Sequence, residues 1–589
     1  MSVEFLIGYN DNIFKYDKNL IMRGKKMKKI IYGESNFRKI KINSDYFYID
    51  KTKHIETLEN LNESFLIFLR PRRFGKSLFL STLQYYYDEN SKDEFEAMFH
   101  DTYIGQNPTP LKNSYRILFF EFSGIEVKED EPKETYKDFT DNIKKGAVSY
   151  LKRYEYPKED IKNIYTLNNP KEVIKVFFEM VKGDSIYLLI DEYDQFANAI
   201  LAHSMQEFLK LVGKGGFVRS FYEVLKGATQ TGTVQKMFIT GVTPITLDSL
   251  SSGFNIVSNI SHHRYFNDMA GFTQEEVEYS LSESIFKRCD IEEKDKLLSK
   301  LKTWYDGYLF DIEANERIYN ATLVNYFISN FNYDKCTIHK KMLDVNVASD
   351  YKAIMRLFNI GDSERNYKIL KNLIETNSIT GTIKDRYDLN REFSEDDFIT
   401  LIYSMGFITI KDEIVTGLYE FKIPNYVIKI LYFNYFAVEL ERRNQFKITK
   451  SIGRILTQLL LGDIDPFKNQ LSEVIKILSN RDHQGFDEKY FQIIALSFFS
   501  FAEFYFIESQ PEKDRKYPDI LLIGRDERVP NNYLFELKWV KGKDNYKYIK
   551  KEGIKQVKRY LELDKVKSIP KLRSFLLIGS KDGVEFVKC

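Results

Sequence analysis

Three consecutive residues, Gly75-Lys76-Ser77, are of the types that bind a chain of phosphates. They follow an apolar run at Phe65–Leu69 and precede a helical pattern at Leu78–Tyr87. In a strand–loop–helix arrangement, the loop N–H groups and the helix dipole hold phosphate oxygens. Lys76 then neutralises the β and γ oxygens, and Ser77 offers its hydroxyl to Mg²⁺. The sequence therefore predicts a nucleoside triphosphate site at this loop.

The loop departs from the usual pattern at one position. Arg70 stands where G-x-x-x-x-G-K-[ST] has its first glycine. Arg73 and Phe74 immediately precede Gly75 and complete the residues of the loop that we expect to bind nucleotide. Arg72 and Arg73 could contact phosphates, or the nucleotide of a neighbouring subunit, and simple loop charges are an equally good interpretation.

A second apolar run, Tyr187–Ile190, ends in the acidic pair Asp191-Glu192. At a strand end, Asp191 is suited to holding Mg²⁺ through water, and Glu192 to polarising the attacking water. The alternative is that the pair merely ends a strand, but two matching halves in the expected order favour a site. A third apolar run ends in Thr240, where a polar residue can sense the γ-phosphate. The chain has no N-K-x-D guanine motif, so ATP is favoured over GTP.

Near the C-terminus, two carboxylates and a lysine have the spacing of a metal-dependent phosphodiester site. Asp519 begins one predicted strand, and Glu536 and Lys538 lie on one face of the next, because strand side chains alternate. Two carboxylates at one place can bind Mg²⁺, which activates water, while Lys538 orients the nucleophile. Gln556 on the following predicted helix completes this set of candidate residues.

A basic segment follows the carboxylates. Residues 538–560 contain nine basic and two acidic side chains, a local charge of +7. Lys547, Lys551, Lys555 and Arg559 recur every four residues and therefore line one face of a helix. Such a face can follow a DNA or RNA backbone without reading its sequence. A solvated helix face is an equally weighted alternative.

The motifs around the phosphate loop resemble those of the AAA-ATPase-like family. They are Tyr46-Phe-Tyr-Ile-Asp-Lys-Thr52, Leu69-Arg-Pro-Arg-Arg-Phe-Gly-Lys-Ser77, Leu189-Ile-Asp-Glu-Tyr-Asp194, Phe238-Ile-Thr-Gly-Val-Thr-Pro244, Ser252-Gly-Phe-Asn-Ile256 and Trp304-Tyr-Asp-Gly-Tyr308. The resemblance covers about residues 30–310 and implies a P-loop ATPase fold. It also accounts for Arg70, because R-P-R-R-F-G-K-S is that family's own form of the loop.

In the same family, the ATPase domain is typically fused to a C-terminal PD-(D/E)XK nuclease-like domain. Residues 485–589 resemble that domain, and the resemblance implies that Glu488 on its first helix is an additional acidic residue of the site. The segment before Asp519 lacks the glycines expected there.

The order of apolar patterns predicts an α/β protein with four parts. Residues 1–29 form a polar tail, and translation from Met27 is left open. In residues 30–310, short apolar runs alternate with helical patterns, which indicates a P-loop domain with a parallel sheet. The spacing in residues 311–484 is mainly helical and predicts a connector. Residues 485–589 read α-β-β-β-α-β, a second α/β domain of the PD-(D/E)XK type.

The composition is that of an ordinary globular chain. Of 589 residues, 43% are apolar and 29% are charged. The 87 Lys and Arg residues nearly balance 85 Asp and Glu residues, so the net charge of +2 names no partner. Any nucleic-acid surface must therefore be a local patch.

Cysteine use and hydropathy bear on the location of the protein. Cys289, Cys336 and Cys589 are far apart and form no C-x-x-C pair. They predict neither a disulfide framework nor a zinc module, and they favour a reducing compartment. The chain has no secretory signal, and its most apolar stretch, Ile493–Ile507, is too short to span a bilayer. We therefore expect a cytoplasmic protein without a membrane partner.

These observations together predict an ATP-binding and ATP-hydrolysing protein, with ATP and Mg²⁺ as cofactors. The hydrolysis would be coupled to a metal-dependent nuclease-like domain that acts on DNA or RNA. Two alternatives stay open: an ATP-dependent switch or nucleic-acid binder with an inactive nuclease fold, and a non-enzymatic interaction protein. A homo-oligomer is compatible with either.

Overall fold

The structure is a computed structural model. It describes residues 28–589 except 44, 126–131, 214, 246–255, 340–341, 386, 388–390, 445–451, 482–485, 503, 509–517, 526–527 and 542–544. The predicted tail at residues 1–29 therefore lies outside the described residues apart from its last two positions. The same holds for all but the last residue of the predicted motif at residues 252–256.

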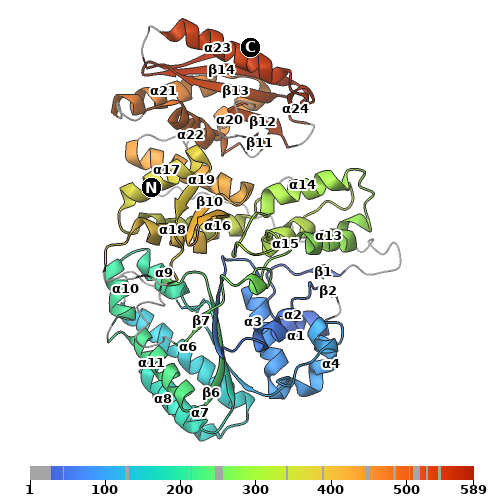
Figure 1. The fold of residues 1–589 in the computed structure, drawn as a ribbon, viewed down its shortest axis with the longest axis vertical. Coiled ribbons are helices and arrows are strands. Elements are labelled where there is room, and N and C mark those ends of the chain that lie inside the picture. Colours follow the sequence, from blue (N-terminus) through green and yellow to red (C-terminus); the bar gives the residue numbers. More distant parts are fainter. Residues whose placement is uncertain are drawn as a thin grey trace, which may run out of the picture.

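The molecule is elongated, with a sheet at each end and a largely helical region between them (Figure 1). The N-terminal sheet is entirely parallel and has the order β4-β5-β6-β3-β7. Its strands are β4 (Arg116–Glu121), β5 (Ile186–Asp191), β6 (Val234–Gly241), β3 (Phe65–Leu69) and β7 (Ser258–Asn259). The parallel sheet confirms the predicted α/β class for this region.

Helices cover both faces of this sheet, which explains why its strands are continuous apolar runs. In Figure 1, α3 and the blue helices lie on one side of the sheet, and α6, α8 and α11 lie on the other. A small parallel pair, β1 (Lys29–Ile30) and β2 (Tyr46–Phe47), precedes them. The helices described here are α1 (Phe37–Ile42), α2 (Lys53–Glu59), α3 (Lys76–Tyr87), α4 (Phe95–Phe99), α5 (Tyr103–Gln106), α6 (Pro132–Arg153), α7 (Lys158–Thr166), α8 (Pro170–Met180), α9 (Gln195–Leu201), α10 (Met205–Val212), α11 (Phe217–Gln230), α13 (Gln274–Leu281) and α14 (Lys294–Tyr305).

The parallel register brings three strand ends together. Leu69 at the end of β3 is level with Gly241 of β6. Ile190 of β5 is level with Ile239 of β6, so Asp191 and Thr240 are neighbours across the sheet. The phosphate loop, the acidic pair and the predicted sensor therefore emerge at one edge.

The middle region is mainly helical but also holds a short sheet that was not predicted. It contains a three-stranded antiparallel sheet of β8 (Ile379–Gly381), β10 (Leu418–Lys422) and β9 (Thr409–Val415). The charged residues of β9 are exposed or partly exposed and interrupt its apolar pattern, so the alternation that predicts a strand is absent. The helices described here are α15 (Ala321–Ser329), α16 (Val345–Ile354), α17 (Ser363–Thr376), α18 (Glu395–Ser404), α19 (Tyr426–Asn444), α20 (Ile452–Leu461) and α21 (Asp465–Arg481).

The C-terminal sheet has the order β11-β12-β13-β14-β15. Its strands are β11 (Tyr505–Glu508), β12 (Ile520–Gly524), β13 (Asn532–Trp539), β14 (Leu572–Ser580) and β15 (Gly583–Lys588). Only the β13–β14 pair is parallel. In Figure 1, α23 (Tyr546–Leu561) covers one face, and α21 and α22 (Glu488–Phe499) cover the other; α24 (Asp564–Lys567) follows α23. The predicted α-β-β-β-α-β order is present, and β15 adds a strand that was not predicted.

The C-terminal sheet is packed onto the N-terminal part of the chain. The Trp304 ring at the end of α14 lies 4.7 Å from the ring of Tyr426 and 5.7 Å from that of Phe506 in β11, measured between centroids. The Tyr426 hydroxyl accepts a hydrogen bond of 2.6 Å from the backbone N–H of Ile507. The guanidinium of Arg525 lies 5.5 Å from the Trp304 ring. One aromatic cluster therefore joins the C-terminal sheet to α14 and α19.

One disulfide contradicts the expectation from cysteine spacing. Cys289 and Cys336 are bonded, with their Cα atoms 5.5 Å apart, although 47 positions separate them in the sequence. The bond links the segment before α14 to the loop after α15, a contact that no local pattern reveals.

Among the described residues, no helix combines the length and the apolar character needed to cross a membrane.

Candidate functional sites

The phosphate loop connects β3 directly to α3. Gly75 caps the helix with φ of +100°, a left-handed conformation that favours glycine. Lys76 is the first residue of α3 and is buried. Its ammonium donates hydrogen bonds to the backbone carbonyls of Arg70, at 2.9 Å, and Pro71, at 3.1 Å. Burial lowers the pKa of Lys76, while the carboxylates of Glu192 and Asp191 oppose this shift.

The acidic pair lies opposite this lysine. Asp191 is buried at the end of β5 and accepts a hydrogen bond from the hydroxyl of Thr240 on β6. Glu192 has φ of +52°, which is uncommon for a residue with a side chain and is often found at functional sites. Burial raises the pKa of Glu192, and Lys76 partly offsets this. A carboxyl with a raised pKa is suited to accepting a proton near neutral pH.

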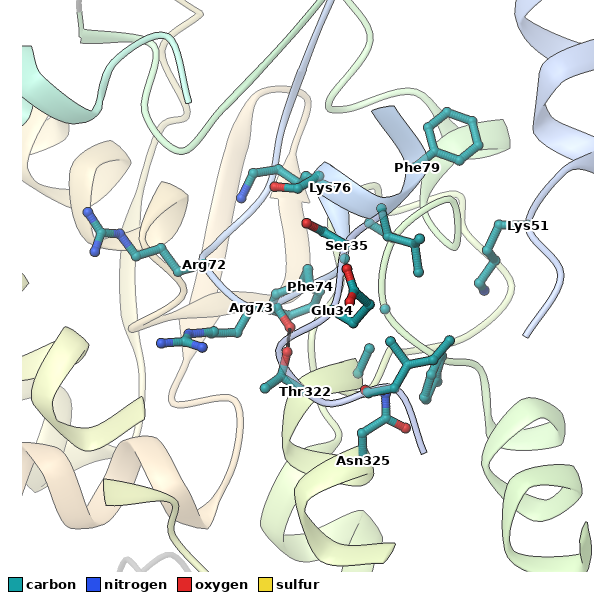
Figure 2. Close-up of a pocket in the computed structure, with 18 of the residues that line it drawn as sticks. Glu34, Ser35, Lys51, Arg72, Arg73, Phe74, Lys76, Phe79, Thr322 and Asn325 are labelled. Atoms are coloured by element: carbon teal, nitrogen blue, oxygen red, sulfur yellow. Dashed lines mark hydrogen bonds between the residues drawn. The ribbon is translucent and has the colours of Figure 1, made fainter. Parts of the chain in front are cut away.

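A cavity of about 410 Å³ lies beside the loop, which is in the size range of small-molecule sites. The loop residues 72–77 and Glu192 line one part of it. Side chains that lie far away in the sequence line the rest, and Figure 2 shows several of them around the loop. The apolar lining includes Ile31, Phe47, Ile49, Met269, Ala270 and Phe272. The lining therefore includes both charged groups suited to phosphates and apolar side chains suited to a base.

Arg70 occupies the position of the first glycine without lining this cavity. Its guanidinium is buried and donates to three carbonyls: Leu69 at 2.9 Å, Ser261 at 2.7 Å and Phe266 at 2.9 Å. It also lies 4.3 Å from the ring of Phe68 and 4.0 Å from that of Phe310. Burial lowers the pKa of Arg70 to about 9, which still leaves it charged at neutral pH. Arg70 is therefore a structural cation behind the loop.

Two other loop residues are also held by distant parts of the chain. The Arg73 guanidinium forms an ion pair of 2.6 Å with Asp350 of α16. The Arg73 carbonyl accepts a hydrogen bond of 2.8 Å from the hydroxyl of Thr322 on α15. The ring of Phe74 is buried edge-on against Tyr308, with centroids 4.9 Å apart. Both residues line the cavity, but their side chains already have partners in the protein.

Asp194, which was not among the predicted site residues, shapes this edge of the sheet. Asp194 is buried, and its carboxylate accepts hydrogen bonds from the backbone N–H groups of Val242, at 3.0 Å, and Thr243, at 2.7 Å. It therefore fixes the chain just after β6. A third acidic residue behind an acidic pair was a visible signal, but its acceptor role depends on a segment 48 residues later.

The C-terminal carboxylates converge as the strand pattern predicts. Ile520 is opposite Phe535 in the antiparallel pair of β12 and β13, so Asp519 is opposite Glu536. Asp519 accepts a hydrogen bond of 2.7 Å from the backbone N–H of Leu537. The Lys538 ammonium donates to Glu536 at 2.8 Å and to Glu488 of α22 at 3.0 Å.

The two strand carboxylates are held away from water. Burial and the neighbouring Glu536 charge raise the pKa of Asp519 well above its usual value. Burial also raises the pKa of Glu536, although Lys538 opposes this. The carboxylates in turn raise the pKa of Lys538 against the effect of burial. Two buried acids and one ammonium therefore share a single site.

This donor set fits a divalent cation at two carboxylates. One oxygen of Glu536, Oε2, is buried and has no hydrogen-bond partner in the described structure. A hard cation is the kind of partner that such an oxygen and the adjacent Asp519 carboxylate lack. No cluster of three or more Asp, Glu, His or Cys side chains arranged to hold a metal ion occurs in the described residues. Water or a phosphate oxygen must therefore complete the ligands of any metal here.

The residues predicted on α23 lie where the helical spacing puts them. Gln556 donates a hydrogen bond of 2.6 Å to the hydroxyl of Tyr560. Burial and the charge of Glu536 raise the pKa of Tyr560 to about 12, so Gln556 is one residue removed from the carboxylates. The predicted basic face is exposed and consists of Lys547, Lys551, Lys555 and Arg559.

Comparison with known protein families identifies the two domains that carry these candidate sites. Residues 31–251 match the family described as "Predicted AAA-ATPase", and residues 486–582 match the PD-(D/E)XK nuclease superfamily. The chain carries an AAA-ATPase-like domain and a PD-(D/E)XK nuclease domain. Both resemblances predicted from the motifs are thereby confirmed, as is the α/β fold class.

One curated relative matches part of the chain. It is a protein of Azotobacter chroococcum mcd 1, described as "Uncharacterized protein in vnfD 5'region", with 26% identity over 301 residues. The match covers 50% of this chain and 50% of the relative, so the chain aligns with about half of the relative's length.

We expect Arg70→Ala to destabilise the N-terminal domain. The change removes a buried cation and its three hydrogen bonds to buried carbonyls, which corresponds to about 3–5 kcal/mol of unfolding free energy. Urea unfolding followed by circular dichroism measures this loss. The exposed Arg264 is a matched control, and its alanine variant should unfold like the wild type. Coinciding curves for Arg70→Ala and wild type would contradict the structural role.

The raised carboxyl pKa values predict a pH-dependent cost in the nuclease-like domain. A group whose pKa is raised in the folded state contributes stability at low pH that is lost as pH rises through that pKa. In EDTA, Asp519→Asn should therefore become progressively more stable than wild type as the pH rises above about 4, the ordinary aspartate pKa. Mg²⁺ should raise the melting temperature of the wild type only, since the variant lacks one carboxylate.

Differential scanning calorimetry across this pH range provides the measurement. Asp582→Asn, at an exposed carboxylate on the β14–β15 turn, is the matched control and should follow the wild type. A constant difference between Asp519→Asn and wild type at all pH values would show that the carboxyl does not titrate in this way.

Proposed function

We propose that this AAA-ATPase-like protein binds and hydrolyses ATP, and that its nucleotide state controls a metal-dependent nuclease-like domain acting on nucleic acid. The observation that carries the ATPase part is the cavity in which Lys76, Glu192 and the loop amides face one another. The observation that carries the nuclease part is the convergence of Asp519, Glu536 and Lys538 from two strands.

At the nucleotide site, each polar residue has a distinct role in the proposal. The loop amides and Lys76 bind the β and γ phosphates, since the ammonium can exchange its two carbonyl acceptors for phosphate oxygens. Glu192 polarises the attacking water and accepts its proton. Thr240 holds Asp191 in place and is near enough to report on the γ-phosphate. Ser77 and Asp191 would hold Mg²⁺, which supplies charge neutralisation at the phosphates.

At the C-terminal site, Asp519 and Glu536 would hold Mg²⁺, which supplies an activated water and neutralises the phosphodiester. Lys538 orients the attacking water, because its ammonium projects beside both carboxylates. Glu488 positions Lys538 through their hydrogen bond. Gln556 holds the hydroxyl of Tyr560 in place through a hydrogen bond.

The proposed substrate is a nucleic-acid backbone. Exposed cations on α23, the helix that also carries Gln556, suit contacts to phosphates that carry no sequence information. DNA and RNA both present this backbone.

A second candidate function is an ATP-dependent switch whose nuclease fold binds nucleic acid without cutting it. One observation favours it: Lys538 is already paired with both Glu536 and Glu488, so part of the negative charge at the site is balanced without a metal.

We expect Lys76→Ala to weaken ATP binding by one to a few powers of ten. The variant loses charge-assisted hydrogen bonds of about 1.5–3 kcal/mol each, and backbone amides alone cannot balance the phosphate charge. Glu192→Gln should bind ATP normally and slow hydrolysis by about 10²–10⁴-fold, because it keeps the shape and loses the base. Calorimetry and phosphate release measure the two effects.

Lys175→Ala, at an exposed lysine on α8, is the matched control for the first variant and should bind ATP like the wild type. Unchanged ATP affinity in Lys76→Ala would exclude this loop as the nucleotide site.

We expect Asp519→Ala and Glu536→Ala each to abolish Mg²⁺-dependent cleavage while nucleic-acid binding persists or tightens. A carboxylate repels phosphate until a metal is bound, so its removal costs catalysis but not affinity. Lys538→Ala should also stop cleavage but retain metal binding, because an ammonium is never a ligand. Gel assays with labelled DNA and RNA, with and without ATP, give the readout.

The basic face is tested with Lys551→Glu and Lys555→Glu together, which should weaken binding and reduce its salt dependence by a slope of about two or more. Reversal of the exposed Lys175 and Lys210 in the N-terminal domain is the matched control. Wild-type protein that binds nucleic acid but never cuts it under any metal or nucleotide condition would favour the switch. Protein that neither binds nor cuts would refute both candidates.

A further inference from the structure

The three arginines of the phosphate loop differ in what they already contact. Arg70 is buried behind the loop on three carbonyls, and Arg73 is paired with Asp350. Arg72 forms no hydrogen bond or ion pair with any residue that the structure describes, and its half-buried side chain lines the nucleotide cavity. Of the three cations, it is therefore the one whose charge is available to a ligand.

Arg72 lies at the phosphate end of the cavity. It is close enough to Lys76 and Glu192 for its charge to act on both side chains. In the view of Figure 2, the Lys76 ammonium and the Arg72 guanidinium extend to the same side of the loop, and Glu34 and Ser35 lie on the other. The apolar lining suited to a base is formed by other segments, such as Phe47 and Phe272. Arg72 is thus placed where the terminal phosphate of a bound triphosphate would be.

We propose that Arg72 contacts the γ-phosphate of ATP bound in the same chain and stabilises the negative charge on that phosphate during hydrolysis. This inference rests on the proposed ATPase function and adds a catalytic residue to it. In the reaction, the oxygen of a water molecule attacks the γ-phosphorus and the bond to the β-phosphate oxygen breaks. ADP leaves with the electron pair of that bond, the products are ADP and inorganic phosphate, and Glu192 accepts the water proton.

The charge balance of the cavity supports this role. Besides the proposed Mg²⁺, Lys76 offers one positive charge near the terminal phosphates, while Asp191 and Glu192 add two negative charges at the same edge of the sheet. A second cation at the γ position offsets this excess when ATP binds. Arginine suits the task, since its planar donors match phosphate oxygens bidentately and its charge does not depend on pH. An arginine of this kind contributes about 10³–10⁵-fold to hydrolysis in other phosphoryl-transfer enzymes.

The test compares ATP and ADP, because only ATP carries the group that Arg72 is proposed to touch. In the full-length protein, Arg72→Ala should lower ATP affinity by about 10–100-fold, as expected for one lost charge-assisted contact, and change ADP affinity by less than about threefold. Single-turnover hydrolysis at saturating ATP should fall by at least about 100-fold. Arg72→Lys should restore part of the ATP affinity and little of the rate, because a lysine keeps the charge but not the planar donors.

The controls separate this inference from the proposed function on which it rests. Arg264→Ala removes an exposed arginine outside the cavity and should leave both nucleotide affinities unchanged. Wild-type protein that does not bind ATP would refute the ATPase function itself. Wild-type protein that binds ATP while Arg72→Ala retains the same preference for ATP over ADP would overturn the role of Arg72 alone, as would an equal loss for both nucleotides.

Mixing the variants decides whether the arginine acts within its own chain. Arg72→Ala retains Lys76, and Lys76→Ala retains Arg72. If Arg72 served a neighbouring subunit, a mixture of the two proteins would regain hydrolysis. The proposal expects the mixture to show only the sum of the two separate rates, and recovery would overturn it.

Discussion

A buried positive charge fixes the geometry of the nucleotide site. Arg70 is almost completely buried. Its charge is tolerated there because three carbonyls and two aromatic rings replace water around its guanidinium. These carbonyls belong to the end of β3 and to the segment after β7, so the cation holds two separate stretches of chain together. Only five residues lie between Arg70 and Lys76. The phosphate loop is therefore anchored immediately before its first residue, where a glycine would leave it free to move.

Both candidate sites keep a lysine, buried for Lys76 and partly buried for Lys538, paired with groups that a ligand would replace. Lys76 donates to two backbone carbonyls of its own loop, and Lys538 donates to two carboxylates. An unpaired buried ammonium would be costly, so each lysine needs these partners when no ligand is present. Binding at either site is then an exchange of partners, in which phosphate oxygens or a metal ion take over interactions that the protein already satisfies. Such an exchange reduces the net gain in free energy on binding. It also makes the affinity sensitive to the exact position of the lysine.

The parts of the sites that follow from local patterns could be predicted from the sequence. Buried runs ending in Asp191 and Thr240 indicated parallel strands, and parallel strands bring their carboxyl ends to one edge. The alternation of Glu536 and Lys538 likewise placed both on one face of a strand. These inferences needed only the period of a strand and the direction of its neighbours.

What could not be predicted depends on contacts between distant segments. Arg70 takes acceptors from residues 191 and 196 positions later, and Arg73 pairs with an aspartate 277 positions later. The Cys289–Cys336 bond is of the same kind. No periodicity encodes such pairings, so the sequence alone left the roles of Arg72 and Arg73 open. The structure separates them by what each one touches.

The segment Trp304–Tyr308 contacts both the phosphate loop and the C-terminal sheet. Tyr308 packs against Phe74 of the phosphate loop, while Trp304 packs against Phe506 in the first strand of the C-terminal sheet. Five consecutive residues thus belong to both packing units. Replacing the C-terminal domain by recombination would leave the indole of Trp304 facing an unmatched surface. A domain exchange would therefore require an incoming strand whose side chain fills the space that Phe506 occupies beside the Trp304 ring.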